Sequence, residues 1–527
     1  MARQLPTEYD YVIVGAGSAG CVLARRLSED AGARVLLLEA GEPDRRREIH
    51  IPAAFAKLFK TSCDWDYETE PQPHLGGRRL YWPRGKMLGG SSSMNAMIYI
   101  RGHRSDFDAW RDAGNEGWGF DEVLPYFKKA EHRERGADAF HGAGGPLNVA
   151  DLRTVNPLSR AFVAAAAELG HALNEDFNGA RQEGFGFYQV TQKGGRRCSA
   201  AAAYLKPALR RPNLTVLTGA HATRLLFEGV RASGVEYVRE GRAERARAGR
   251  EVLLSGGAVN SPQLLMLSGV GPADELRRLG VEPLADLPGV GRNLQDHLIV
   301  AVAYACTRPV SLASAEAGRH VANYLLFKKG PLTSNVGEAG GFVRTRPGLA
   351  APDLQFHFGP VYYLSHGFVR PEGHGFTIGP TLIRPESRGH ITLRSADPFD
   401  PPSIQPCYLE AEADLRTLVE GVKVARELAH TKALGGYRGA AVCEKLGTDE
   451  EIAEHVRDAA ETIYHPTGTC RMGDDALAVV DARLRVRGVE GLRVVDASVM
   501  PSIVGGNTNA AVIMLAEKAA DAIKADA

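Results

Sequence analysis

A chain of 527 residues is longer than one hydrophobic core usually supports, so two or more lobes are expected. Hydrophobic residues make up 44% and charged residues 24%, as in ordinary globular proteins in water. The 63 Lys and Arg balance the 63 Asp and Glu, and this neutrality gives no reason to expect nucleic acid or a strongly acidic partner.

No run of about 18 uninterrupted apolar residues occurs, so we expect no transmembrane helix. The polar segment 1–10 leads directly into an apolar strand, and we expect no signal peptide there. The cysteines are scattered, odd in number and without a CxxC pair, and they predict neither a disulfide framework nor a metal site: Cys21, Cys63, Cys198, Cys306, Cys407, Cys443 and Cys470. A reduced, cytoplasmic protein is the simplest interpretation, and peripheral association with the inner face of the cell membrane stays open.

The first elements along the chain predict one βαβ unit. The apolar run 9–14 is typical of a buried strand, a glycine-rich turn occupies 15–20, and a helical pattern leads to a second apolar run at 34–38. Because such crossovers are right-handed, both strands are expected in one parallel sheet.

Later segments add predicted strands at 213–218, 222–227, 233–238 and 251–255. A helix is expected to begin near Ser261 and Pro262, with proline in its first turn, where no N–H donor is needed. Turn-rich strands then alternate with a helix at 410–430, and the chain ends with a strand within 486–498 and an amphipathic helix at 509–524. Early and late segments are therefore expected to share one nucleotide-binding lobe, and the middle to form another.

The turn at 15–20 predicts a dinucleotide-binding site. GxGxxG alone is weak evidence, but here it follows a strand, opens a helix and precedes Glu39 by about twenty residues. Gly15 permits the tight turn, Gly17 lets the pyrophosphate approach, and Gly20 lets helix and strand pack closely. Ribose hydroxyls are expected to donate to Glu39, which also disfavours a 2′-phosphate. The alternative is a glycine turn in an ordinary α/β fold, and Glu39 argues against it.

A second glycine-dense segment at 84–97 offers backbone donors and hydroxyls in close succession. The first fingerprint does not choose between NAD and FAD, whereas this segment would suit a second part of a long cofactor. The alternative interpretation is a flexible loop.

Five segments, in order along the chain, resemble sequence blocks of the glucose–methanol–choline (GMC) family of FAD-dependent oxidoreductases. The first two are similar to the family's signatures, and all five are 85–102, 257–271, 289–297, 464–473 and 494–510. Within the family, the chain looks most like bacterial alcohol dehydrogenases of alkane-degradation pathways, with choline dehydrogenases further away.

The resemblance implies an α/β fold for essentially the whole chain. It predicts a Rossmann-like FAD-binding lobe with a parallel sheet, made of 1–154, 213–300 and 460–527. It also predicts a substrate-binding lobe built on a mostly antiparallel sheet with helices, made of 155–212 and 301–459. The implied reaction oxidises a primary aliphatic or aryl alcohol to the aldehyde and passes the electrons to a quinone-like acceptor.

The resemblance also assigns site residues. The family's catalytic histidine falls on His465, and its second active-site position falls on Asn509. Contacts to the ADP part of FAD are implied for Gly15, Gly17, Ser18, Gly20, Glu39, Ala40 and Ala222. Contacts to the flavin, ribityl and pyrophosphate parts are implied for Gly90, Ser91, Asn95, Ala96, Met97, Asp496 and Ala497.

Two departures from the family pattern stand out. Met94 occupies the position at which some members carry a histidine bonded covalently to the flavin, so we expect non-covalent FAD. Ala511 replaces the proline of the motif NTNAP, which changes little because the chain enters a helix there in either case.

The chemistry expected of these residues is acid–base catalysis. A neutral imidazole suits removal of the hydroxyl proton, since its ordinary pKa of about 6.5 lies near working pH. Asn509 is expected to donate to the same oxygen as charge develops on it, although it also suits a helix cap. His297 is expected to be structural, and Ile463 is a candidate pocket wall.

Other functions stay open at this point. An oxidase would differ only in how its reduced flavin reacts with oxygen, which the sequence does not reveal. A choline dehydrogenase is disfavoured by the absence of an identifiable carboxylate cage. An FAD-containing lyase or decarboxylase on the same fold, and a non-catalytic electron carrier, are further alternatives.

Overall fold

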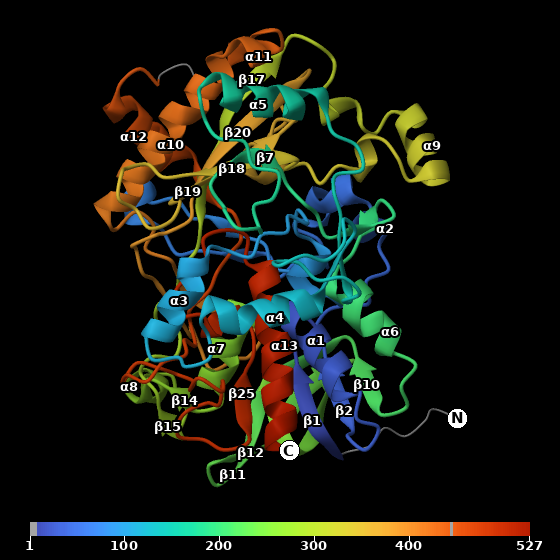
Figure 1. Cartoon of the computed structure of the whole chain (residues 1–527). Coiled ribbons are helices and arrows are strands. Elements are labelled where there is room, and N and C mark those ends of the chain that lie inside the picture. The colour runs from blue at the N-terminus through green and yellow to red at the C-terminus, as the bar shows by residue number, and fades with distance from the viewer. Residues whose placement is uncertain (1–7, 443–445) are drawn as a thin grey trace.

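The computed structural model describes residues 8–442 and 446–527, which form two sheets with helices packed around each (Figure 1). Segment 1–7, where we expect no signal peptide, and Cys443 lie outside the described residues. The other six cysteines are free thiols. Within the described residues, no helix is both long and apolar enough to cross a membrane.

The first sheet has seven strands in the order β10-β2-β1-β13-β12-β11, with β25 also paired to β13. These strands are β1 (Glu8–Val14), β2 (Val35–Leu38), β10 (Leu214–Leu217), β11 (Ala220–Glu228), β12 (Arg231–Arg239), β13 (Arg242–Leu254) and β25 (Leu492–Val494). Strands β10, β2, β1, β13 and β25 run parallel. The βαβ unit and the four later strands predicted for this region are confirmed, with β13 starting earlier than expected.

One long strand joins two kinds of pairing in this sheet. The first half of β13 pairs antiparallel with β12, whereas its last residues pair parallel with β1 and with β25. Early and late parts of the chain therefore meet on a common strand, as expected.

Helices α1 (Ser18–Leu27) and α13 (Asn509–Asp526) lie side by side against this sheet (Figure 1). The guanidinium of Arg26 on α1 binds both carboxylate oxygens of the buried Glu517 on α13, each at 2.8 Å. Tyr204 also donates to Glu517 at 2.9 Å, so this buried charge is paired and hydrogen-bonded.

The second sheet has eight strands in the order β23-β17-β20-β19-β18-β7, with β16 joining β20 to β24. Every pairing in it is antiparallel. Its strands are β7 (Gly184–Phe187), β16 (Leu298–Val300), β17 (Val302–Cys306), β18 (Ala339–Val343), β19 (Leu354–Gly359), β20 (Gly375–Leu382), β23 (Arg438–Ala441) and β24 (Ala460–Thr462). Helices α10 (Glu412–His430) and α5 (Pro157–Glu168) cover it, and the predicted helix at 410–430 is thereby confirmed.

The start of helix α7 was predicted wrongly from its proline. The helix spans Gly257–Leu267, so Pro262 lies inside it rather than in its first turn. Because proline has no N–H, the carbonyl of Ala258, one turn earlier, loses its helical partner. The hydroxyl of Thr469 donates to that carbonyl at 2.7 Å, and this compensates for the lost bond.

Shorter helices and two-stranded pairs complete the fold. The remaining helices include α2 (Arg47–His50), α3 (Arg104–Asp112), α4 (Phe120–Ala130), α6 (Lys206–Ala208), α8 (Ala273–Arg278), α9 (Gly318–Phe327), α11 (Lys432–Gly435) and α12 (Asp449–Ala459). Two-stranded pairs are β3 (Tyr67–Glu68) with β4 (Tyr81–Trp82), β5 (Glu131–Arg133) with β6 (Leu147–Val149), β8 (Gln192–Lys193) with β9 (Arg196–Arg197), β14 (Val270–Gly271) with β15 (Ala285–Asp286), and β21 (His390–Thr392) with β22 (Ser403–Gln405). The limits given above for the two lobes stay a prediction.

Candidate active site

The glycine turn after β1 has the geometry of a nucleotide-binding turn. A β-carbon at Gly15, whose φ is +96°, would lie 2.5 Å from the carbonyl oxygen of Ser255, and one at Gly20 would lie 1.9 Å from that of Gly15. These two glycines are therefore needed for packing within the fold. At Gly17 a β-carbon would meet nothing closer than 3.9 Å, yet Gly17 lines the large cavity of the molecule. Its lack of a side chain leaves room for a ligand rather than for the protein itself.

Glu39, at the end of β2, is buried beside this turn. The backbone N–H groups of Ala16 and Gly41 donate to its two carboxylate oxygens at 2.8 and 2.9 Å. Burial raises the pKa of Glu39 to about 7, against these two hydrogen bonds and the nearby charge of Lys86. Each oxygen keeps acceptor capacity for a further donor, as recognition of ribose hydroxyls requires.

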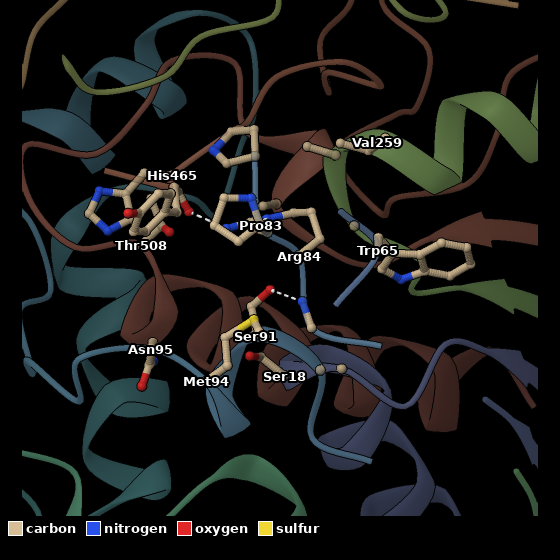
Figure 2. A pocket seen from close by; sticks show the side chains of 18 of the residues that line it. Ser18, Trp65, Pro83, Arg84, Ser91, Met94, Asn95, Val259, His465 and Thr508 are labelled. Atoms are coloured by element: carbon tan, nitrogen blue, oxygen red, sulfur yellow. Dashed lines mark hydrogen bonds between the residues drawn. The ribbon is translucent and has the colours of Figure 1, made fainter. Parts of the chain in front are cut away.

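One continuous cavity connects the predicted cofactor residues. Figure 2 shows His465 and Thr508 at one end, Trp65 at the other, and Ser18 and Ser91 between them. Of the sequence-predicted site residues, all except Gly20 line this cavity: Gly15, Gly17, Ser18, Glu39, Ala40, Gly90, Ser91, Asn95, Ala96, Met97, Ala222, His465, Asp496, Ala497 and Asn509. Gly20 contacts the backbone of Gly15 instead.

The second glycine segment packs directly on the first. A β-carbon at Gly90, whose φ is +50°, would lie 2.7 Å from the Cα of Gly17. The hydroxyl of Ser91 accepts from the N–H of Gly85 at 3.2 Å, and Figure 2 shows this contact at the cavity wall. Asn95 accepts at 2.8 Å from the buried Arg197. These hydrogen bonds fix the segment, so it is an ordered wall of the cavity and not a flexible loop.

The end of the cavity near β11 is aromatic. Trp65 stacks on Tyr67 with ring centroids 5.7 Å apart, and His221 packs edge-on against Trp65. The ammonium of Lys86 lies 4.4 Å from the centre of the Trp65 ring. A planar ligand group suits this wall, which includes the predicted Ala222. Trp65 lies in an irregular segment without any motif, and the sequence interpretation missed it.

Asp496 fixes the start of α7. Its carboxylate accepts from the N–H of Gly257 at 2.8 Å, the hydroxyl of Ser261 at 2.6 Å and the N–H of Ser498 at 2.8 Å. A negative charge at a helix N-terminus is stabilising. Burial raises the pKa of Asp496 above its ordinary value. Its contribution to the cavity is therefore first to hold Gly257 and Ala497 in place.

His465 lies at the opposite end, between the two sheets. Its backbone N–H donates to the buried Asp296 at 2.7 Å, which holds the segment in position. Burial lowers the pKa of His465 well below its ordinary value, and the positive charge of Arg84 adds to this effect. The imidazole is therefore neutral at neutral pH.

Asn507 hydrogen-bonds to His465, whereas Asn509, the predicted second active-site residue, hydrogen-bonds to Ser18. The amide Nδ2 of Asn507 lies 3.3 Å from Nε2 of His465. The amide oxygen of Asn509 instead accepts from the hydroxyl of Ser18 at 2.7 Å. Asn509 is the first residue of α13, and the turn into that helix directs its side chain towards α1. The sequence offers two asparagines two positions apart, and nothing in the motif distinguishes them.

The orientation of the Asn507 amide follows from a second contact. Gln355 Nε2 donates to the amide oxygen of Asn507 at 3.0 Å, which leaves the Asn507 nitrogen facing His465. An amide nitrogen only donates, so Nε2 of His465 accepts and carries a lone pair. The single proton of the neutral ring is then on Nδ1, 3.0 Å from Nδ1 of His297.

The cavity wall near His465 is mostly apolar. Ile299, Val336, Met94 and the predicted Ile463 line it together with Phe59. A substrate bound here would contact hydrocarbon on most sides, which is typical of sites that accept apolar ligands.

Two polar groups interrupt this wall. Nδ1 of His357, on β19, forms a hydrogen bond of 2.9 Å with the hydroxyl of Thr381. Nε2 of His357 has no hydrogen-bond partner among the described residues. Burial lowers the pKa of His357 to about 3. Glu461 also lines the cavity, and burial raises its pKa to about 6. The sequence interpretation singled out neither residue, because each belongs to a short strand with no motif around it.

Comparison with protein families places the chain in one class. The two family models described as GMC oxidoreductase match residues 9–299 and 385–516. The chain belongs to the GMC oxidoreductase family.

Individual relatives refine this class. The chain is 49% identical to an alcohol dehydrogenase [acceptor] of Pseudomonas putida, over 98% of this chain and 95% of that protein. It is 50% identical to the mitochondrial choline dehydrogenase of Homo sapiens, over 98% and 90% of the two chains. A solved structure of a formate oxidase variant of Aspergillus oryzae, concerned with FAD modification, matches with a TM-score of 0.94 and 29% identity over 99% of both chains.

FAD is the cofactor that these findings identify, and the residues of the cavity fit it. The open position at Gly17, the N-terminus of α1 and the carboxylate of Glu39 suit a pyrophosphate and a ribose. The protein is a flavin-dependent oxidoreductase of a family that oxidises alcohols.

Proposed function

We propose that this protein oxidises a primary aliphatic or aryl alcohol to the aldehyde, with His465 as the base. The observation that carries this proposal is the pair of His465 and Asn507 at the flavin end of the FAD cavity. An accepting Nε2 and a donating amide lie 3.3 Å apart and face the same space, beside an apolar wall.

The two residues divide the work on the substrate hydroxyl. Nε2 of His465 takes the hydroxyl proton, a role that a positioned base performs with a gain of about 10² to 10⁴ in rate. Asn507 donates an N–H to the oxygen as negative charge develops on it. Asn509 holds Ser18 at the start of α1 and is assigned to the cofactor side.

The cofactor residues hold FAD without a covalent bond. Gly15, Gly17 and Ser18 take the pyrophosphate, Glu39 the ribose, and the segment 90–97 the flavin side. When bound, FAD supplies the acceptor for the hydride that leaves the α-carbon of the alcohol. Met94 lines the cavity, and a thioether does not form the bond that histidine forms in some family members.

Electrons leave the protein, in this proposal, for a quinone-like acceptor at the inner face of the cell membrane. The similarity to an alcohol dehydrogenase [acceptor] supports this assignment. An oxidase is the alternative, since the formate oxidase matches the whole fold as well. The reaction of the reduced protein with air separates the two.

A choline dehydrogenase is a second candidate because of Glu461. Its carboxylate lines the cavity with the rings of Phe59, Tyr363 and Tyr464, and such a set suits a quaternary ammonium group. However, the N–H of His366 already donates to Glu461 at 3.2 Å, and the charge of Arg78 already opposes the rise that burial causes in the pKa of Glu461. We therefore favour an uncharged alcohol.

The test is an anaerobic titration of the FAD-loaded protein with primary aliphatic alcohols, aryl alcohols and choline. Bleaching by an uncharged alcohol supports the proposal, and slow recovery in air supports a dehydrogenase. Reduction by choline alone, abolished in Glu461→Gln, would transfer the assignment to the second candidate. No reduction by any alcohol would favour a lyase, a decarboxylase or an electron carrier.

A further inference from the structure

Helix α9 exposes three consecutive large apolar side chains. Leu325, Leu326 and Phe327 at its C-terminal end are 63%, 74% and 62% exposed. Figure 1 shows that α9 stands out from the body of the molecule, at the edge of the lobe that contains the second sheet. Single exposed apolar residues are common on proteins, whereas three adjacent ones on a protruding helix mark an interaction surface.

The inner face of α9 does not account for these residues. Tyr324 is the buried residue of the helix and packs with Ala315 and Leu332, and Val321 contacts the same small cluster. The leucines therefore point away from the protein, although burying them would be favourable in water. Their position indicates that another apolar environment covers them.

Exposed basic residues lie at both ends of α9. Arg319 on α9 and Lys329 just after it are exposed. Burial raises the pKa of the Tyr324 phenol, and the charge of the nearby Arg196 opposes that rise. Lys328 donates to the carbonyls of Tyr324 and Leu325 and so caps the helix. We call Arg319, Leu325, Leu326, Phe327 and Lys329 the α9 surface. An apolar helix end with exposed basic residues on the same helix and directly after it complements the hydrocarbon and phosphates of an anionic bilayer.

The α9 surface is connected to one wall of the cavity through the segment 50–55. The cluster around Tyr324 includes Ile51 and Ala53, which belong to the segment that leads to Phe55. Phe55 lines the FAD cavity, and the hydroxyl of Tyr324 donates to the carbonyl of His50. One layer of side chains thus separates the α9 surface from the cavity wall.

We propose that the α9 surface docks onto an anionic lipid bilayer, with Leu325, Leu326 and Phe327 inserted to the depth of the headgroups. No transmembrane helix is required for such binding, since an amphipathic helix lying in the interface suffices. Docking brings the cavity wall at Phe55 towards the membrane. The link to a membrane quinone rests on the proposed function, whereas docking itself does not.

The test is flotation of the FAD-loaded protein with vesicles of phosphatidylcholine and phosphatidylglycerol. The unchanged protein is expected to float with mixed vesicles, and less so at high salt or with pure phosphatidylcholine. The triple variant Leu325→Ser, Leu326→Ser, Phe327→Ser is expected to lose about tenfold or more in binding. Arg319→Gln with Lys329→Gln is expected to lose about fivefold for each charge removed.

A matched control is Val230→Ser with Leu477→Ser, whose side chains are 49% and 48% exposed elsewhere on the molecule. This variant should float like the unchanged protein. Equal flotation of the triple serine variant and the unchanged protein would overturn the proposal. So would an unchanged protein that ignores vesicles but forms a dimer that the triple variant disrupts. Anaerobic reduction by alcohols, measured without vesicles, tests the proposed function separately.

Discussion

Nδ1 of His297 lies 3.0 Å from Nδ1 of His465, with the two rings nearly perpendicular. Burial lowers the pKa of His297 to about 3, so its ring is neutral and its Nδ1 accepts a hydrogen bond from the Nδ1–H of His465. His297, which we expected to be structural, thus also affects the chemistry. It selects the tautomer of His465 in which Nε2 carries the lone pair and can act as a base.

Replacing the base should stop chemistry without removing the cofactor. His465→Ala is expected to keep FAD, because His465 is not among the residues assigned to FAD binding. Its rate of flavin reduction by alcohol should fall by about 10² to 10⁴. Stopped-flow absorbance under anaerobic conditions measures this rate, with the exposed His430→Ala as the control. A variant that reduces flavin at the parent rate would remove His465 from the role of base.

Replacing Asn507 and replacing Asn509 should affect different steps, catalysis in one case and FAD binding in the other. Asn507→Ala removes the donor to the substrate oxygen and is expected to lower kcat by about 10² to 10³, with FAD retained. Asn509→Ala removes one hydrogen bond to Ser18, worth about 1 kcal/mol, and should weaken FAD binding with little change in the hydride rate. Steady-state kinetics and FAD titration of both variants check this assignment. The reverse pattern would return the catalytic role to Asn509.

The pH dependence of kcat/KM should follow His465. The base acts when neutral, and burial lowers its pKa, so activity is full at neutral pH and falls as the pH drops through the lowered value. The acid limb is therefore expected below 6.5, the ordinary pKa of histidine. A limb at or above that value would show that the imidazole is not desolvated in the working enzyme.

The glycines of the turn should differ in what their replacement affects. Gly17→Ala places a β-carbon 3.9 Å from its nearest neighbour and is expected to fold normally but to bind FAD weakly. Gly20→Ala places one 1.9 Å from the carbonyl oxygen of Gly15 and is expected to cost about 3 kcal/mol of stability. Thermal unfolding of the two apoproteins, followed by FAD titration, distinguishes the effects. Tight FAD binding by Gly17→Ala would contradict the proposed path of the pyrophosphate.

FAD should be released on denaturation. Met94 lines the cavity at the position where a covalent histidine is found in some relatives. Acid precipitation is therefore expected to leave the flavin in the supernatant, which absorbance of the separated fractions measures. Yellow colour that stays with the pellet would show a covalent bond formed by another residue.

The sequence predicted the FAD lobe well because its signals are local. A strand, a glycine turn, a helix and Glu39 follow one another within about thirty residues, and each has a defined geometric purpose. The start of α7 was wrong because proline in a first turn is only a preference. Thr469, about two hundred residues away, satisfies the carbonyl that Pro262 leaves without a partner.

The catalytic end was predicted less completely because its contacts are distant in sequence. The choice between Asn507 and Asn509 depends on where α13 begins and on Gln355, which lies on β19 of the second sheet. His357 and Trp65 reach the cavity from a strand and from an irregular segment whose local sequences carry no motif. Such residues can be recognised as part of the site only from the folded structure, in which the two sheets lie together.

The pairing of α1 with α13 makes the first helix depend on residues that are synthesised long after it. The glycine turn leaves the ribosome long before Asn509 and Glu517, which bind Ser18 and Arg26. Until then the first helix lacks its neighbour, and Arg26 has no carboxylate on α13 to bind. A product that stops before α13 would therefore contain the glycine fingerprint without the contacts that Asn509 and Glu517 make to α1.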